Sequence, residues 1–206
     1  MSLNIACWNC RGVMTATPYI SKLLHNSKVD ISCLSEHWLR KCQFNFLQSI
    51  EQNYSAYGKG VDEHCPGNFM VSNSGGVAVL VSNNLATYVT EIEVGSTRIC
   101  RIELKLPNST SIFFLCVYFP AITQPFEHFV NETEYLFDIY NSYSQHGTVF
   151  LLSDLNCKLQ GPRYNCSHDR RSTLVDGLLR NTDSIISLHV QDFSEGQIWT
   201  YRSTEN

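Results

Sequence analysis

Residues 150–156 read Phe150-Leu151-Leu152-Ser153-Asp154-Leu155-Asn156. The apolar residues at the start of this stretch are typical of a buried strand, which we place over Thr148–Ser153. An Asp-x-Asn sequence directly after a strand is, taken alone, most often a turn. The same two side chains also supply the carboxylate and amide oxygens that hard cations such as Mg²⁺ prefer. The stretch therefore predicts either a turn or one part of a metal site.

Two other apolar strands end in polar residues of the same kind. A strand expected over Leu3–Trp8 is followed by Asn9, and one over Val29–Leu34 runs through Ser35 into Glu36. Strand ends are rigid places on which to mount a functional site. Mg²⁺ needs only one or two protein carboxylates, because it keeps several waters. Three such strand ends together favour a shared metal site over three unrelated turns.

Length and composition exclude several classes of protein. The 206 residues correspond to about one domain, which we expect to span residues 1–206. With 43% hydrophobic residues and 17% charged residues, the chain is not a disordered protein. A net charge of −4 excludes a strongly basic DNA-coating protein, although it leaves open an enzyme that acts on nucleic acid. No apolar run is long enough for a membrane span, so we expect no membrane partner.

The nine cysteines are scattered, and the first residues do not resemble a secretory signal. We therefore expect reduced thiols in a nuclear or cytoplasmic protein that is not secreted. Cys7-x-x-Cys10 is the only CxxC pair, and a structural zinc site needs two more ligands at defined spacing. The pair alone does not predict zinc.

The expected elements mix strands with helices. The expected strands are Leu3–Trp8, Val29–Leu34, Val77–Ser82, Arg98–Leu106, Ser111–Tyr118, Thr148–Ser153, Ile185–Val190 and Ile198–Tyr201. The expected helices are Tyr19–Asn26 with Thr17-Pro18 at its start, Phe126–Tyr140, and a segment around Leu174–Arg180. Pro107-Asn108-Ser109 predicts a hairpin in the middle of the chain. The mixture fits an α/β fold in which two sheets pack face to face with helices outside. No Gly-x-Gly-x-x-Gly sequence or phosphate-binding loop supports a nucleotide-binding fold.

Five sequence blocks occur in the order found in one known family. They are Trp8-Asn9-Cys10-Arg11-Gly12, Cys33-Leu34-Ser35-Glu36-His37-Trp38-Leu39, Gly75-Gly76-Val77-Ala78-Val79, Val117-Tyr118-Phe119-Pro120 and Ser153-Asp154-Leu155-Asn156. Together they resemble the endonuclease/exonuclease/phosphatase superfamily. The form of the first two blocks is most similar to the apurinic-type endonuclease domains of non-LTR retrotransposons.

This resemblance implies a four-layer α/β/β/α sandwich like that of deoxyribonuclease I, and metal-dependent cleavage of phosphodiesters. The implied metal ligands for Mg²⁺ (or Mn²⁺) are Glu36 and, beside it, Asn9. The implied catalytic residues are Tyr118 on the scissile phosphate, Asp154 on the attacking water and Asn156 on a phosphate oxygen. Thr200 matches a block near the family's last catalytic residues, which makes it a substrate-binding candidate.

Other polar and aromatic residues near these blocks allow simpler interpretations. Arg11 is either an exposed cation on a tight turn or a phosphate contact. We expect Trp8 and Trp38 in the core, and we expect His37 and His168 on the surface or in loops.

The family pattern continues with an Asp block and a Ser-Asp-His block, and neither occurs in these residues. The sequence ends at Arg202-Ser203-Thr204-Glu205-Asn206, where the Asp block would begin. Loss of an acid–base pair costs about 10²–10⁴-fold in rate. We therefore expect a domain without its closing strands that is catalytically impaired.

The leading functional hypothesis is a DNA-nicking endonuclease of retroelement type. It would act as a monomer, use no small-molecule cofactor, and contact DNA weakly with the help of the metal. One alternative is a non-catalytic remnant or binding module, which the net charge and the missing His favour. A second is an inositol-phosphate phosphatase or a sphingomyelinase-like phosphodiesterase, whose signatures around the Asp-x-Asn block are not evident.

Overall fold

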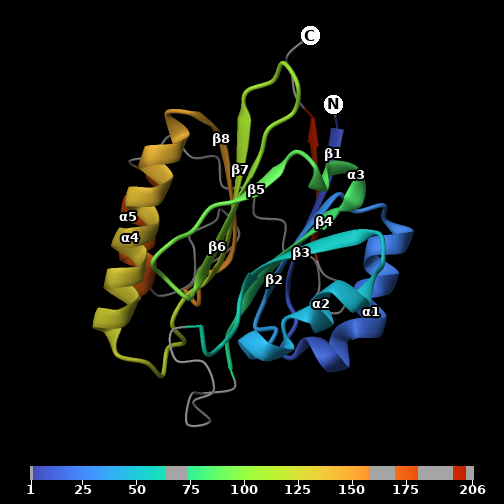
Figure 1. Cartoon of the computed structure of the whole chain (residues 1–206). Coiled ribbons are helices and arrows are strands. Elements are labelled where there is room, and N and C mark those ends of the chain that lie inside the picture. Colours follow the sequence, from blue (N-terminus) through green and yellow to red (C-terminus); the bar gives the residue numbers. More distant parts are fainter. Residues whose placement is uncertain (1, 64–73, 158–169, 181–196, 203–206) are drawn as a thin grey trace.

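Two β-sheets packed face to face form the centre of the molecule in the computed structural model, which describes residues 2–63, 74–157, 170–180 and 197–202 (Figure 1). The first sheet has five strands in the order β3 (Tyr54–Lys59), β4 (Val77–Ser82), β2 (Ile31–Ser35), β1 (Ser2–Asn9) and β9 (Gln197–Arg202). The second has four strands in the order β5 (Val89–Glu91), β6 (Ile99–Leu104), β7 (Ser111–Tyr118) and β8 (Gly147–Asp154).

Helices cover the outer face of each sheet. Figure 1 shows α1 (Val13–Asn26) and α2 (Asn45–Ile50) beside the first sheet, and α4 (Phe126–Ser144) and α5 (Arg170–Arg180) beside the second. A short 3₁₀ turn, η1 (Lys41–Gln43), precedes α2, and α3 (Asn83–Ala86) follows β4. In the described ranges, no helix is both long and apolar enough to cross a membrane.

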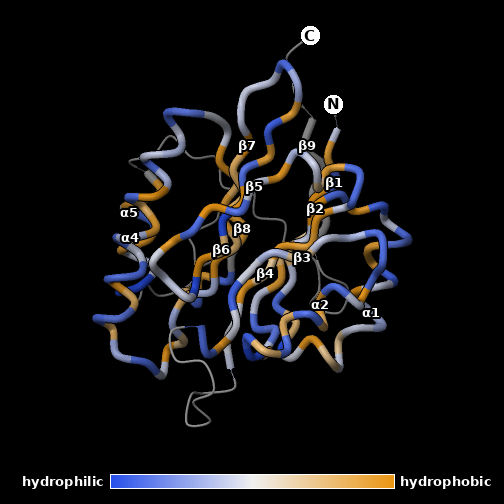
Figure 2. Tube along the Cα trace, viewed as in Figure 1, coloured by the Kyte–Doolittle hydropathy of each residue, from blue (hydrophilic) through white to orange (hydrophobic). Residues whose placement is uncertain are grey.

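The hydrophobic core consists of three clusters of side chains. One lies between the two sheets, and one lies between each sheet and the helices that cover it. Between the sheets, Ile5 and Val79 face Ile102 and Phe114, and all four are buried. A second cluster packs α1 and α2 on the first sheet, and a third packs α4 and α5 on the second. Figure 2 shows the apolar residues concentrated along these contacts. The predicted α/β/β/α sandwich is therefore confirmed.

Two parallel strand pairs place the candidate site. β1 runs parallel to β2 with Asn9 opposite Ser35, and β7 runs parallel to β8 with Tyr118 opposite Asp154. The two pairs come from different sheets, and β8 contacts both β1 and β2 across the interface. The carboxyl ends of all four strands consequently meet at one end of the sandwich, which we call the site end.

The predicted start of the first helix was wrong. α1 begins at Val13, after Gly12 as N-cap, and Pro18 lies inside the helix. The Thr17 hydroxyl donates to the Val13 carbonyl oxygen at 2.8 Å, one turn back, instead of capping a helix at Tyr19. Gly12 has no side chain with which to cap the helix. Its φ of +98°, which glycine adopts readily, turns the chain sharply between β1 and α1.

The strands predicted over Val77–Ser82 and Ser111–Tyr118 are found with the predicted ends. The other predicted elements are found with shifted ends, except the strand at Ile185–Val190, which lies outside the described residues. β3 was missed because its sequence, YSAYGK, has no apolar run and no clean alternation. The short β5 and the helices α2 and α3 were also not predicted. The hairpin of β6 and β7 is confirmed by antiparallel pairing from Ile99 opposite Val117 to Leu104 opposite Ile112.

Candidate active site

Asn9, the last residue of β1, links two carboxylates from distant parts of the chain. Its amide nitrogen Nδ2 donates to Glu36 Oε1 at 2.7 Å and to Asp154 Oδ2 at 2.6 Å. All three side chains are half-buried at the site end. Two carboxylates that share one amide nitrogen define a position where positive charge is favoured.

Glu36 follows β2 in a left-handed backbone conformation, with a φ of +55°. Its carbonyl oxygen accepts the Gly12 N–H at 2.8 Å, which ties the end of β2 to the start of α1. Its second carboxylate oxygen, Oε2, accepts the Trp38 Nε1–H at 3.4 Å. Backbone and side-chain contacts together fix the direction of the carboxylate.

His37 lies in the loop after β2, which agrees with one of the two expected places, but its side chain is buried and not at the surface. Its Nδ1 accepts the Leu39 N–H at 3.0 Å, and its Nε2 lies 3.0 Å from the Lys59 carbonyl oxygen, to which it donates. The ring lies against Gly76, where an added Cβ would be 2.4 Å from His37 Cε1. Burial lowers the pKa of His37 to about 4, so the ring is neutral at neutral pH. This neutral ring anchors the loop that carries Glu36. The second histidine of that expectation, His168, lies outside the described residues.

Tyr118 and Asp154 end the paired strands β7 and β8. The Asp154 carbonyl oxygen accepts the Phe119 N–H at 3.0 Å, and its Oδ1 accepts the Asn156 N–H at 3.1 Å. Burial raises the pKa of Tyr118, and the nearby Glu36 and Asp154 carboxylates raise it further. The phenol therefore lies close to both carboxylates and stays protonated at neutral pH.

Asn9, Glu36, Tyr118 and Asp154 form a cluster at the site end, and the remaining candidate residues differ in their distance from it. Asn156 belongs to it, with Nδ2 donating to the Phe119 carbonyl oxygen at 2.8 Å. Arg11 is exposed, and its backbone N–H donates to Asn9 Oδ1 at 3.3 Å. Thr200 in β9 pairs with Asn4, in the half of β1 that is farther from Asn9. The structure thus brings Arg11 to the site end but not Thr200.

Comparison with known proteins identifies this architecture. No protein-family model and no curated protein matches the chain in sequence. Among solved structures it is similar to the catalytic domain of APE2 from Xenopus laevis, with a TM-score of 0.65 and 16% identity over 87% of this chain and 67% of that one. The chain has the endonuclease/exonuclease/phosphatase fold.

Two further structures with this fold are similar over most of the chain. The AP endonuclease LMAP from Leishmania major gives a TM-score of 0.63 at 14% identity, over 88% of this chain and 66% of that one. The endonuclease domain of TRAS1, a telomere-specific non-LTR retrotransposon, gives 0.59 at 13% identity, over 88% of this chain and 73% of that one. The chain thus spans about two thirds of the length of APE2's catalytic domain and of LMAP.

Arg98 is a site residue that sequence reasoning missed. Its guanidinium carbon lies 5.5 Å from the centre of the Tyr118 ring, and Nη1 donates to the Tyr118 carbonyl oxygen at 3.4 Å. Nη2 donates to Gln124 Oε1 at 3.1 Å, which holds the guanidinium in place. The nearby cation opposes the rise in the pKa of Tyr118. Only the pairing of β6 with β7 brings Arg98 to Tyr118, so no local sequence signal marks it.

The donor set suits a hard divalent cation. In residues 2–63, 74–157, 170–180 and 197–202, no cluster of three or more Asp, Glu, His or Cys side chains is placed to hold a metal. Glu36 and Asp154 supply two carboxylates and Asn9 one amide oxygen, which matches a Mg²⁺ site that keeps several waters. A softer metal would require the thiolate or imidazole ligands that this cluster lacks.

Proposed function

We propose that the cluster at the site end hydrolyses phosphodiester bonds with the help of Mg²⁺ or Mn²⁺, and that the chain is a DNA-nicking endonuclease of retroelement type. The observation that carries the proposal is the pair of carboxylates, Glu36 and Asp154, held on the single amide of Asn9. The likeness in fold to the APE2 catalytic domain, to the AP endonuclease LMAP and to a retrotransposon endonuclease domain supports DNA as the substrate.

Glu36 and Asn9 would hold the cation, and the Asp154 carboxylate accepts a hydrogen bond from the same Asn9 amide nitrogen as Glu36. When bound, a divalent cation neutralises charge on the phosphate and makes a nearby water more acidic. Phosphoryl transfer asks the protein mainly for positioning and for stabilisation of charge on the phosphate oxygens. The rigid strand ends that carry these side chains meet the first of these requirements.

The other residues act directly on the substrate and the water. Asp154 accepts a proton from the attacking water on a carboxylate oxygen, and its hydrogen bonds to Asn9 and to the Asn156 backbone set the direction of that carboxylate. Tyr118, kept protonated by burial and by Glu36, donates its O–H to a phosphate oxygen. Asn156 has two amide N–H groups, and the contact with Phe119 uses one of them, so the second can reach the phosphate.

The test is nicking of supercoiled plasmid by the polypeptide of residues 1–206, with Mg²⁺, with Mn²⁺ and with EDTA. We expect slow nicking that requires the metal, because these residues contain no Ser-Asp-His sequence. Asp154→Asn keeps the size of the side chain and removes the proton acceptor, so it should lower the rate by about 10²–10⁴-fold.

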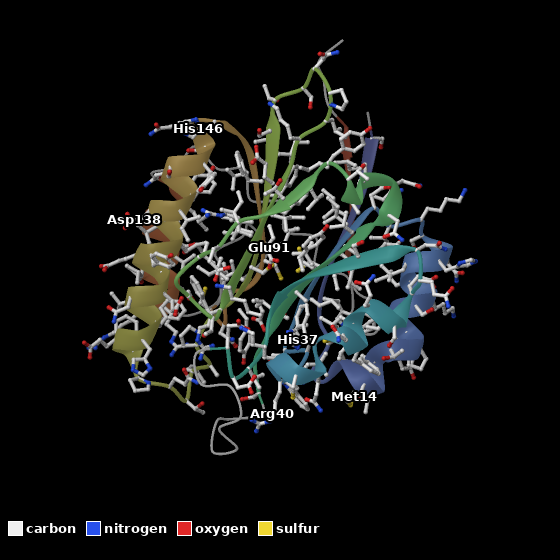
Figure 3. All side chains as sticks on the ribbon, in the orientation of Figure 1. Met14, His37, Arg40, Glu91, Asp138 and His146 are labelled. Atoms are coloured by element: carbon white, nitrogen blue, oxygen red, sulfur yellow. The ribbon has the colours of Figure 1, made fainter. Side chains whose placement is uncertain are left out.

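The matched control is Asp138→Asn, an exposed carboxylate on α4, which should leave the rate unchanged. Figure 3 shows Asp138 on the outer helix, away from the site end. Metal-independent nicking, or equal rates for Asp154→Asn and the unmodified chain, would contradict the proposal. Rates equal to those of a related endonuclease that contains a Ser-Asp-His sequence would contradict only the expected slow nicking.

A further inference from the structure

Trp38 presents an exposed aromatic ring beside the candidate metal ligand. Its side chain is 42% exposed, although the sequence favoured a place in the core. The indole lies two residues after Glu36, and its Nε1–H points at Glu36 Oε2 at 3.4 Å. A large apolar ring is thus held at the surface, next to the position where the substrate phosphate is expected.

Several contacts hold this ring in one orientation. Trp38 has a left-handed φ of +62°, and its N–H donates to the Gly75 carbonyl oxygen at 3.0 Å. One side of the ring packs on Gly12, where an added Cβ would lie 2.8 Å from Trp38 Cε3. His37, the residue before Trp38, is held by the two hydrogen bonds of its buried ring and lies in the lower half of the molecule in Figure 3. The indole is therefore oriented before any ligand arrives.

The surroundings of the ring indicate what it would contact. Arg11 is exposed and lies one residue before Gly12, on which the Trp38 ring packs. An aromatic face beside a cation, next to a phosphate site, is the combination that proteins use to stack nucleobases along a nucleic-acid backbone. A single exposed apolar residue is ordinary on a protein surface. Trp38 differs because backbone contacts hold its ring in one orientation beside Glu36.

We propose that Trp38 is a substrate-contacting residue that stacks on the nucleobase next to the scissile phosphate, and that it selects DNA in which this base is unpaired. The inference rests on the proposed function of the site. Inside a regular duplex both faces of a base are covered by its neighbours, so the base must leave the stack to reach the indole. A mismatched, bulged or terminal base leaves the stack at the lowest free-energy cost. DNA that contains such a base should therefore bind most tightly.

The test measures DNA binding without cleavage, in a chain that carries Asp154→Asn throughout. The probe is a fluorescent duplex with one bulged nucleotide, titrated in Mg²⁺ and followed by anisotropy. Adding Trp38→Ala should weaken binding about 10-fold, within the range found for loss of one base–aromatic stack. Trp38→Phe should retain most of the affinity, because phenylalanine keeps an aromatic face.

The control variant is Tyr88→Ala, which removes a ring of similar exposure, 40%. Tyr88 precedes β5 at the end of the molecule opposite the site end, because Val89 pairs with Leu104 and Leu104 pairs with Ile112 near the start of β7. The Tyr88→Ala variant should therefore bind DNA as tightly as its parent. Thermal unfolding of each variant checks that it is folded, and quenching of tryptophan fluorescence on binding, lost in Trp38→Phe, reports the stacking directly.

A second probe separates stacking from the hydrogen bond between Trp38 and Glu36. When the bulged nucleotide is replaced by a baseless analogue, the difference between Trp38→Ala and its parent should disappear. A difference that persists would mean that Trp38 only orients Glu36, and equal binding of all variants to the bulged duplex would also overturn the inference. If the parent binds no DNA, the proposed function fails together with the inference; if it binds independently of Trp38, only the inference fails.

Discussion

The two ends of the sandwich use left-handed backbone in different ways. At the site end, four residues other than glycine have positive φ, namely Arg11, Glu36, Trp38 and Asn156. At the opposite end, Lys28 and Asn108 have positive φ, in the connection from α1 to β2 and in the hairpin between β6 and β7. Such conformations cost of order 1 kcal/mol or more for each residue.

The contacts around these residues explain the difference. The hairpin turn at Asn108 is held by local bonds, in which the Leu106 carbonyl oxygen accepts the N–H and the hydroxyl of Ser109. At the site end long-range bonds are added, because the Glu36 carbonyl oxygen accepts the Gly12 N–H and the Trp38 N–H donates to the Gly75 carbonyl oxygen. Asn9 also joins Glu36 to Asp154 across the two sheets. Backbone strain at a turn is ordinary, whereas strain supported by contacts between sheets marks a site whose geometry is fixed for function.

The largest effect expected at the site end comes from Gly76→Ala. The new Cβ would lie 2.4 Å from the buried, doubly hydrogen-bonded ring of His37, and Gly76 itself has a φ of +84°. We expect a loss of about 3 kcal/mol or more in the free energy of unfolding, measured with urea. The matched change Gly177→Ala, inside α5 with no atom within 4 Å of the new Cβ, should instead stabilise the protein by up to about 1 kcal/mol. Similar losses for both variants would show that the site end is not specially packed.

The next effect is a pH dependence caused by His37. Because the folded pKa is about 4 and the ordinary value is 6.5, the unfolded chain binds a proton between these pH values while the folded protein does not. The contribution of neutral His37 to the free energy of unfolding is therefore fully present above pH 6.5. It falls by about 3 kcal/mol as the pH drops to 4. Urea unfolding across this range should be less pH-dependent in His37→Gln than in the unmodified chain. Identical pH profiles would contradict the buried neutral ring.

A smaller effect concerns the tyrosine at the site. Tyr118→Phe removes the donor to the phosphate oxygen but keeps the ring, so plasmid nicking should fall by about 10²-fold while the fold is retained. Arg98→Lys should weaken nicking less, because a cation remains near the phenol. If Tyr118→Phe nicks at the unmodified rate, Tyr118 is a packing residue only.

The smallest effect is expected at the opposite end. Lys28→Gly relieves a φ of +46°, so it should raise the free energy of unfolding by up to about 1 kcal/mol and leave nicking unchanged. A loss of nicking in this variant would mean that the backbone at Lys28 affects the site end. The two ends would then not differ in function as described above.

Much of the site could be predicted from the sequence because its residues lie where apolar strands stop. Asn9, Glu36 and Asp154 each follow or end such a run, and parallel pairing brings strand ends together without further information. Asn156 belongs to the same Asp-x-Asn signal after a strand, whereas Tyr118 came from the resemblance to a family. These residues are positioned by elements that the sequence pattern shows directly.

The rest could not be predicted because it depends on contacts between distant residues. His37 is buried because Gly76 leaves room for its ring, and nothing in either local sequence shows that the two meet. Trp38 is exposed because a left-handed backbone turns it outward. The start of α1 was misplaced because Thr17-Pro18 resembles a helix start, while Gly12 makes the actual one through its bond to Glu36.

Calorimetric titration of Mn²⁺ or Mg²⁺ into the polypeptide of residues 1–206 measures whether Asn9 and Glu36 form a metal site. We predict one bound ion at neutral pH, with binding lost in Glu36→Ala and retained in Lys28→Gly. No binding to the unmodified chain, or binding that Glu36→Ala leaves unchanged, would contradict a metal site on Asn9 and Glu36.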